Sequence, residues 1–373
     1  MRPAKELPNP AKTWRRPGRC SKSWRGKPSA RSTPKDRSPR PRKRGTWHSN
    51  PTLKRDQALG CWPSPRSFPQ PLPDRRWNLS MSRSTTYALC LSFSLQLASA
   101  AQPVSPPAGI LYEPDIVVGK GGDVELMLDL ARPEKVDSDP LPCVVMIHGG
   151  GWRGGDRKGH VPHIFEFARQ GYVSATIQYR LVPKARFPAQ IEDAKCAVRY
   201  LRANRRRFGL NPDRIGAIGF SAGGHLAMML GTMDKADGLE GTGGHADQSS
   251  KVQAVVSYFG PTDLAANDFP ALVGGIVNDF LGSTPEENPT IRKQASPIAY
   301  LDKYDAPLLI FHGTKDRIVP HTQAYRMADA MTKAGLPGRV ELLIGADHGW
   351  SGGELARTVN ETVAFFDDHL KAN

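Results

Sequence analysis

From about residue 110 to the end of the chain, short apolar runs alternate with stretches of helical periodicity. Runs rich in β-branched residues predict seven strands, at 124–130, 143–147, 172–179, 214–220, 252–259, 307–311 and 340–344. Helical periods follow several of them, over 191–201, 225–230, 321–333 and from 353 onward. This alternation predicts one α/β domain with a mostly parallel central sheet flanked by helices.

Ligands of parallel sheets lie outside the carboxyl ends of the strands, so the turns that follow strands are where chemistry is expected. The strongest signal is the sequence GFSAG at 219–223, between the strand 214–220 and a helix. Glycines on both sides of Ser221 permit a tight strand-to-helix turn that exposes the hydroxyl group. We predict that Ser221 is a nucleophile; the alternative is an ordinary glycine-rich turn.

A second turn, HGGGW at 148–152, directly follows the strand 143–147. Consecutive glycines let backbone N–H groups converge on one point, as the oxyanion hole of acyl transfer requires. Donors would come from this loop and from Ala222, the residue after the nucleophile. A phosphate-binding loop is disfavoured because no Gly-Lys-Ser/Thr follows. We expect His148 to fix the loop and not to act as the base.

The third signal is a pair of residues, Asp316 after the strand 307–311 and His348 after the strand 340–344. The chain order Ser221, Asp316, His348 is the order of a nucleophile, acid and base on an α/β-hydrolase sheet. Asp347 is a weaker candidate for the acid. We expect His225 to be a packed histidine inside a helix, and His321 to cap or begin one.

Charge divides the chain into two parts. Residues 1–80 hold 21 of the 51 Lys and Arg but 4 of the 36 Asp and Glu, a net +17, whereas the other 293 residues carry a net −2. Because 1–80 also contains 14 of the 33 prolines and almost no aliphatic residues, we predict a disordered basic extension. A nucleic-acid-binding arm is the less favoured interpretation, so no nucleic-acid partner is expected.

Residues 81–100 have the pattern of a signal peptide: a basic start, an apolar run over 87–97, and Ala-Ser-Ala at 98–100. We hypothesise that translation starts at Met81, that 1–80 is not translated, and that the mature catalytic domain, 101–373, is secreted or periplasmic. Otherwise the protein is expected in the cytoplasm. No apolar run is long enough to span a membrane. The five cysteines imply no disulfide framework.

Together these motifs resemble the α/β-hydrolase superfamily across 110–373, and in particular the bacterial feruloyl and acetylxylan esterase-like group, which is related to hormone-sensitive-lipase-type carboxylesterases. The resemblance implies an α/β-hydrolase fold, a triad of Ser221, Asp316 and His348, and a reaction without metal or cofactor. It assigns the oxyanion donors to the amides of Gly150, Gly151 and Ala222. The basic extension is a departure from that group.

The expected activity is hydrolysis of carboxylic esters, such as acetyl or feruloyl esters of polysaccharide fragments, through an acyl-enzyme. The alternatives are a serine peptidase or an amidase or formamidase on the same fold, or a binding protein without catalysis. Trp152 and Trp350 could line the site and stack a sugar or cinnamoyl group, or else pack their loops. Residues 264–300 predict a short partial cap over an open cleft. No particular oligomeric state is indicated.

Overall fold

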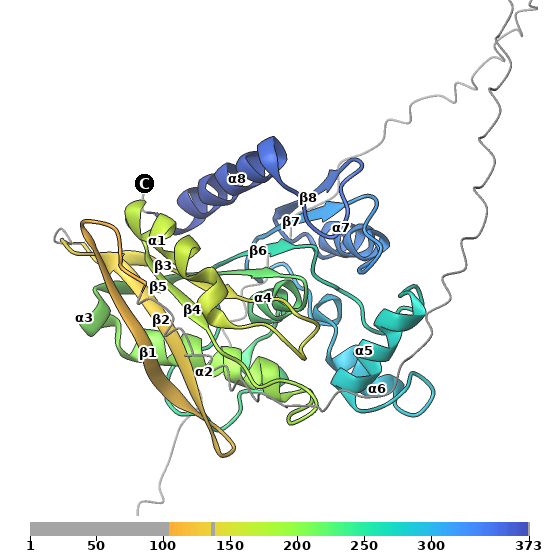
Figure 1. The fold of residues 1–373 in the computed structure, drawn as a ribbon. Helices are drawn as coiled ribbons and strands as arrows, with labels where there is room; N and C mark the ends of the chain where they lie inside the picture. The colour runs from red at the N-terminus through yellow and green to blue at the C-terminus, as the bar shows by residue number, and fades with distance from the viewer. Residues whose placement is uncertain (1–103, 136–138, 372–373) are drawn as a thin grey trace, which may run out of the picture. The chain divides into compact units, whose positions relative to one another are not determined.

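The computed structural model describes residues 104–135 and 139–371, which contain one eight-stranded sheet (Figure 1). The strands lie in the order β1-β2-β4-β3-β5-β6-β7-β8. Their bounds are β1 Ile110–Gly121, β2 Val124–Pro133, β3 Leu141–Ile147, β4 Val173–Ile177, β5 Leu210–Phe220, β6 Ala254–Tyr258, β7 Leu308–Gly313 and β8 Gly338–Leu343.

Seven of the eight strands run in one direction, and β2 runs opposite to them. β2 pairs antiparallel with β1 and with β4, and every other pairing is parallel. The predicted mostly parallel sheet is therefore confirmed. Since the carboxyl ends of parallel strands lie at one edge, the turns after β3, β5, β7 and β8 are brought together there.

Helices cover both faces of the sheet (Figure 1). Side chains of α1 and α8 pack on one face, and those of α2, α4 and α7 pack on the other. The helices are α1 Val161–Arg169, α2 Ala189–Ala203, α3 Arg205–Phe208, α4 Ala222–Thr232, α5 Ala271–Leu281, α6 Pro289–Gln294, α7 Thr322–Ala334 and α8 Gly352–Leu370, with 3-10 turns η1 Arg157–His160, η2 Lys235–Asp237 and η3 Pro297–Ala299.

All seven predicted strands are present, with ends that differ by a few residues. The sequence pattern missed β1 because register shifts at 113–116 and 117–119 interrupt its alternation of buried and exposed residues. It also missed α1. The predicted partial cap corresponds to α5, α6 and η3, which lie between β6 and β7.

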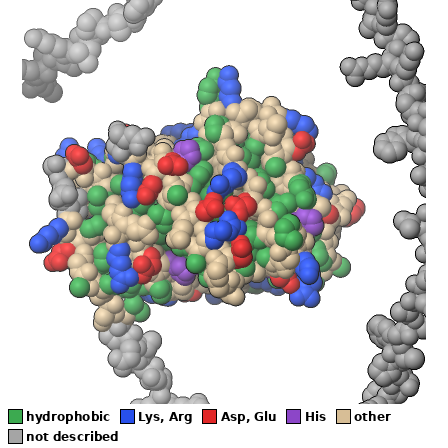
Figure 2. Space-filling view, turned by 90° about the horizontal axis from the view of Figure 1, so that it is seen from above, with side chains coloured by type: hydrophobic (Ala, Val, Ile, Leu, Met, Phe, Trp, Pro, Cys, Tyr) green, Lys and Arg blue, Asp and Glu red, His purple; other side chains and the backbone are tan. Residues whose placement is uncertain are grey.

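The predicted extension 1–80 and the predicted signal sequence 81–100 lie outside the described residues. Within the described part, no helix is both long and apolar enough to cross a bilayer. Figure 2 shows acidic and basic side chains interspersed with apolar ones over one face. This face is consistent with the near-neutral charge of the chain after residue 80.

Candidate active site

Ser221 occupies a strained turn between β5 and α4. Its φ of 53° and ψ of −119° are rarely adopted by a residue with a side chain. Its amide donates a hydrogen bond to the carbonyl oxygen of Tyr258 in β6, over 2.9 Å. A Cβ on Gly219 would lie 2.1 Å from the carbonyl oxygen of Gly223, so a larger residue does not fit at 219. The turn thus places the hydroxyl at the N-terminus of α4, where negative charge is favoured.

The three residues predicted as a triad lie within hydrogen-bond distance of one another. Nε2 of His348 is 3.0 Å from Oγ of Ser221, and Nδ1 of His348 is 2.7 Å from Oδ2 of Asp316. Asp316 follows β7 and His348 follows β8, as the sequence indicated. The arrangement suits transfer of the hydroxyl proton to an imidazole that a carboxylate orients.

The Asp316 carboxylate is buried, and both of its oxygens have polar partners. Its Oδ1 accepts hydrogen bonds from the amides of Ile318 and Val319, over 2.8 and 2.9 Å, and Nε2 of His312 lies 3.3 Å from Oδ2. Burial alone would raise the pKa of Asp316. The contacts with His312 and His348 outweigh burial and hold the pKa well below its usual range. The side chain therefore stays ionised at neutral pH.

The glycine-rich loop after β3 lies against the Ser221 turn. A Cβ on Gly149 would be 2.8 Å from the carbonyl oxygen of Phe220, and Gly150 and Gly151 have φ values of 113° and 59°. Within 139–371, the amides of Gly150, Gly151 and Ala222 donate no hydrogen bond to another backbone or side-chain group. These N–H groups are available for an oxyanion beside Ser221.

His148 supports this loop, as predicted. Its ring stacks on Tyr179, with centroids 4.2 Å apart, and its Nδ1 lies 2.8 Å from the carbonyl oxygen of Gly149. The Tyr179 hydroxyl donates to the carbonyl oxygen of His148 over 3.0 Å. Burial lowers the pKa of His148, which favours a neutral ring in a structural position.

Trp152 packs the loop against the cap. It is 3 % exposed and stacks on Phe280 of α5, and its indole N–H donates to Nδ1 of His225 over 3.3 Å. Because Nδ1 accepts, Nε2 of His225 carries the proton and donates to the carbonyl oxygen of Ala295, 2.6 Å away. Burial lowers the pKa of His225 to about 4. His225 is thus the packed histidine that the sequence predicted.

Trp350 fastens the loop that carries His348. Its indole N–H donates to Oγ1 of Thr358 in α8 over 2.9 Å, and its ring packs against Tyr258 and Phe259. Trp350 does not line the cleft above Ser221, whereas Trp152 is one of its lining residues. The geometry therefore favours the packing interpretation for Trp350, while Trp152 both packs its loop and borders the cleft.

The remaining candidates have other roles. Asp347 forms an ion pair with Arg317, 2.6 Å between Oδ2 and Nη2, and does not contact the His348 ring. His321 is the residue before α7 and makes no side-chain cap hydrogen bond.

A cleft of about 370 Å³ opens above Ser221, within the usual size range of small-molecule sites. Most of the side chains that line it are apolar. Four come from α5 and the turn before it, namely Phe269, Val273, Ile276 and Val277. All four lie within the partial cap predicted over 264–300, but the sequence reasoning did not assign them to the cleft wall. Val273, Ile276 and Val277 are spaced as i, i+3 and i+4, which could have indicated that they share one face of a helix. The spacing does not tell whether that face is directed toward the nucleophile.

Comparisons with known proteins find esterases among the proteins similar to this chain. A model of the BD-FAE family matches residues 128–331, which contain Ser221 and Asp316. Two curated proteins of Mycobacterium tuberculosis, Esterase LipQ and Esterase LipC, are each 31 % identical to the chain, over 224 and 247 residues. The matches cover 59 % and 64 % of this chain but 53 % and 60 % of those proteins. The chain thus spans little more than half of their length.

Solved structures with the same fold include a truncated carbohydrate esterase from gut microbiota, with a TM-score of 0.61 and 26 % identity over 69 % of this chain and 95 % of that one. Another is the thermophilic esterase Est2 of Thermogutta terrifontis, with a TM-score of 0.60 and 27 % identity over 70 % of this chain and 94 % of that one. A form of Est2 phosphorylated by paraoxon has a TM-score of 0.59, with 27 % identity over 73 % of this chain and 99 % of that one.

Proposed function

Because the chain belongs to the BD-FAE family of α/β-hydrolases, we propose that it hydrolyses carboxylic esters through an acyl-enzyme on Ser221. The observation that carries the proposal is the continuous contact from Ser221 through His348 to Asp316, at 3.0 and 2.7 Å. The comparisons confirm the α/β-hydrolase fold and the resemblance to the esterase group.

His348 takes the proton from Ser221 as the hydroxyl attacks the ester carbonyl carbon. Asp316 accepts the Nδ1–H of His348, which fixes the tautomer and stabilises the imidazolium. The amides of Gly150, Gly151 and Ala222 bind the oxyanion, and His348 then protonates the leaving alcohol. Water attacks the acyl-enzyme by the same route and releases the carboxylic acid.

The decisive experiment compares the wild-type protein with Ser221→Ala on an activated ester such as p-nitrophenyl acetate. Turnover is expected for the wild type and is expected to be lost in the variant. Paraoxon is expected to add a diethylphosphoryl group to Ser221, detected by mass spectrometry, because Est2 is phosphorylated by it. Near-normal activity of Ser221→Ala would contradict the proposal.

We propose, as the finer substrate assignment, acetyl or feruloyl esters linked to carbohydrate. Support comes from the similarity to the gut carbohydrate esterase and to a bifunctional GH43-CE protein of Bacteroides eggerthii. Acetylated xylan and methyl ferulate, assayed beside p-nitrophenyl esters, test it. Assays of an ester and its isosteric amide in parallel distinguish an esterase from a peptidase or amidase.

We also propose that residues 81–100 direct export and that the mature protein is secreted or periplasmic. The basic, apolar and small-residue order of this segment supports the proposal. Cell fractionation and N-terminal sequencing of the native protein test it. A cytoplasmic protein that keeps residues before Met81 would contradict it.

A further inference from the structure

The cleft above Ser221 has two apolar walls from different parts of the chain. One is the α5 wall, made of Phe269, Val273, Ile276 and Val277. The other is the triad wall, made of Phe259, Pro261, Ile318 and Val319. The Phe259 ring lies 4.5 Å from the His348 ring, and Ile318 follows Asp316 by two residues. The triad wall therefore adjoins the acid and the base.

The mechanism of ester cleavage determines which wall contacts the alcohol half of the ester and which contacts the acyl half. His348 must deliver its proton to the alcohol oxygen, so the alcohol lies beside His348, on the triad wall. The carbonyl oxygen points to the amides of Gly150, Gly151 and Ala222. The acyl chain then takes the remaining direction, along the α5 wall.

Ile276 stands directly over the oxyanion loop. A Cβ on Gly151 would lie 3.2 Å from Cγ2 of Ile276. The helix is fastened in this position, because Phe280 stacks on Trp152 with ring centroids 4.2 Å apart, and Asp279 pairs with Arg153 over 3.2 Å. These contacts hold α5, and Ile276 with it, against the oxyanion loop.

The triad wall is open at one residue, Ile318, whereas Pro261 and Val319 in the same wall are buried. Ile318 is 45 % exposed, so solvent reaches this side of the cleft. Building on the proposed function, we propose that Ile276 sets the length of the acyl chain, and that the alcohol half is accepted over a wide range of sizes. Of the two acyl groups proposed above, this favours acetyl over feruloyl: the substrate class is then an ester of a short, apolar acid with a large or polymeric alcohol.

Two series of substrates separate these halves. The first varies the acid, as p-nitrophenyl acetate, butyrate, hexanoate and octanoate. The second keeps acetate and varies the alcohol, as 4-nitrophenol, 1-naphthol and 4-methylumbelliferone. We expect kcat/KM to fall by roughly tenfold or more from butyrate to octanoate, because the added methylenes collide with Ile276 and displace the ester, which costs about 1–3 kcal/mol. Among the three acetates we expect differences of about threefold at most, because the alcohol stays solvated.

Variants of α5 test the assignment to Ile276. Ile276→Ala is expected to raise the hexanoate-to-acetate ratio of kcat/KM roughly tenfold, because space for about two further methylenes is created. Ile276→Phe is expected to lower the butyrate-to-acetate ratio by a similar factor. Leu272→Ala is the matched control, since Leu272 lies on the same helix, is 80 % exposed and does not line the cleft. Its ratios are expected to equal those of the wild type.

Unchanged ratios in both Ile276 variants, in proteins that still hydrolyse acetate, would overturn this inference and leave the esterase proposal standing. Equal turnover of acetate and octanoate by the wild type would overturn it too. Absence of hydrolysis of every ester would overturn the proposed function itself, and the inference with it.

Discussion

Trp152 and Phe280 stack face to face, with ring centroids 4.2 Å apart and planes 10° apart. The contact joins the oxyanion loop to α5, although the two residues are separated by 128 positions in the sequence. The His225 ring packs perpendicular to both rings and accepts the indole N–H. The loop that would bind the oxyanion and the helix that would bind the acyl chain therefore rest on one aromatic cluster.

We expect Trp152→Ala to lower the free energy of unfolding by about 3–5 kcal/mol, as large aromatic truncations in a core do. Trp152→Phe keeps a ring against Phe280 but leaves Nδ1 of His225 without its donor, and is expected to cost about 1 kcal/mol. Urea unfolding followed by circular dichroism measures both. Equal losses in the two variants would show that the indole hydrogen bond, and not the stacked ring, carries the contact.

Asp316→Asn is expected to lower kcat on an activated ester by roughly 10⁴-fold. Oδ1 of Asp316 accepts two backbone N–H groups, so the asparagine oxygen is expected to occupy that place and its NH₂ group to face His348. Nδ1 of His348 would then accept, Nε2 would carry the proton, and Ser221 would lose its base. Steady-state kinetics with a melting curve as a control checks this. A loss of less than tenfold in a folded variant would contradict the assigned acid.

His225 makes the protein less stable in acid. Its pKa is lowered by burial to about 4, against 6.5 for an ordinary histidine. As pH falls from 6.5 toward 4, the unfolded chain takes up a proton that the folded chain does not, so stability decreases by about 3 kcal/mol for this residue. Unfolding free energies at pH 7, 6, 5 and 4 test the sign. In His225→Gln, which keeps a donor and an acceptor, the decrease is expected to be smaller by that amount.

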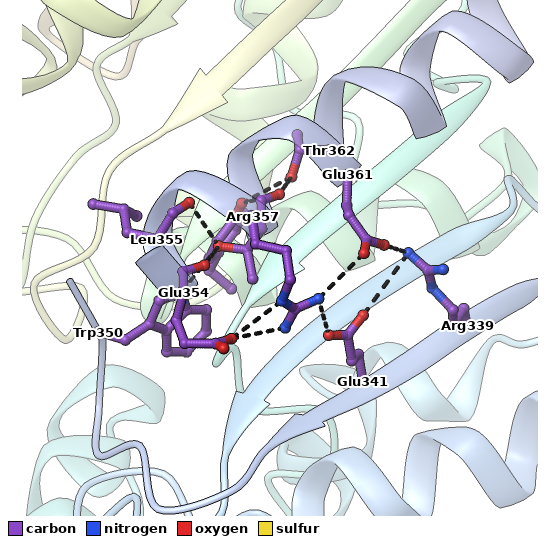
Figure 3. Close-up of polar contacts among 10 residues, drawn as sticks. Arg339, Glu341, Trp350, Glu354, Leu355, Arg357, Glu361 and Thr362 are labelled. Carbon is purple, nitrogen blue, oxygen red and sulfur yellow. Dashed lines mark hydrogen bonds and ion pairs between the residues drawn. The ribbon is translucent and has the colours of Figure 1, made fainter. Parts of the chain in front are cut away.

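Arg357 lies at the centre of an ion cluster between α8 and β8 (Figure 3), the two elements that flank the His348 loop. Its guanidinium contacts Glu341, Glu354 and Glu361. Because the cluster is solvent-exposed, we expect Arg357→Gln to lower the melting temperature slightly at low salt. The difference is expected to vanish near 1 M NaCl, where such pairs are screened. A difference that persists at high salt would indicate a packing role.

The sequence was sufficient for features that depend on local pattern. Ser221 lies between glycines at the end of a strand, and Asp316 and His348 each follow an apolar run, so strand order and turn position predicted their meeting. The strand β1 was not predicted, because its register shifts interrupt the alternation of buried and exposed residues.

The features that the sequence did not predict depend on contacts between residues far apart in the chain. The orientation of Trp152 depends on Phe280, and the wall above Ser221 depends on the direction in which α5 faces. Lys195 and Arg199 are charged residues that hydropathy alone assigns to solvent. Both are buried, since Glu240, more than forty positions away, binds each of them over 2.9 Å. No local pattern specifies that pairing.

The position of His225, one helical turn after Ser221, has a consequence for inactivation. Its ring contacts Trp152 on one side and the carbonyl oxygen of Ala295, at the end of α6, on the other. The imidazole of His225 thereby connects α4, which begins after the nucleophile, with the oxyanion loop and with the cap segment. Detachment of the cap and collapse of the reactive centre should then occur as one event on heating, and protease cleavage within 264–300 should begin at the temperature where hydrolysis stops.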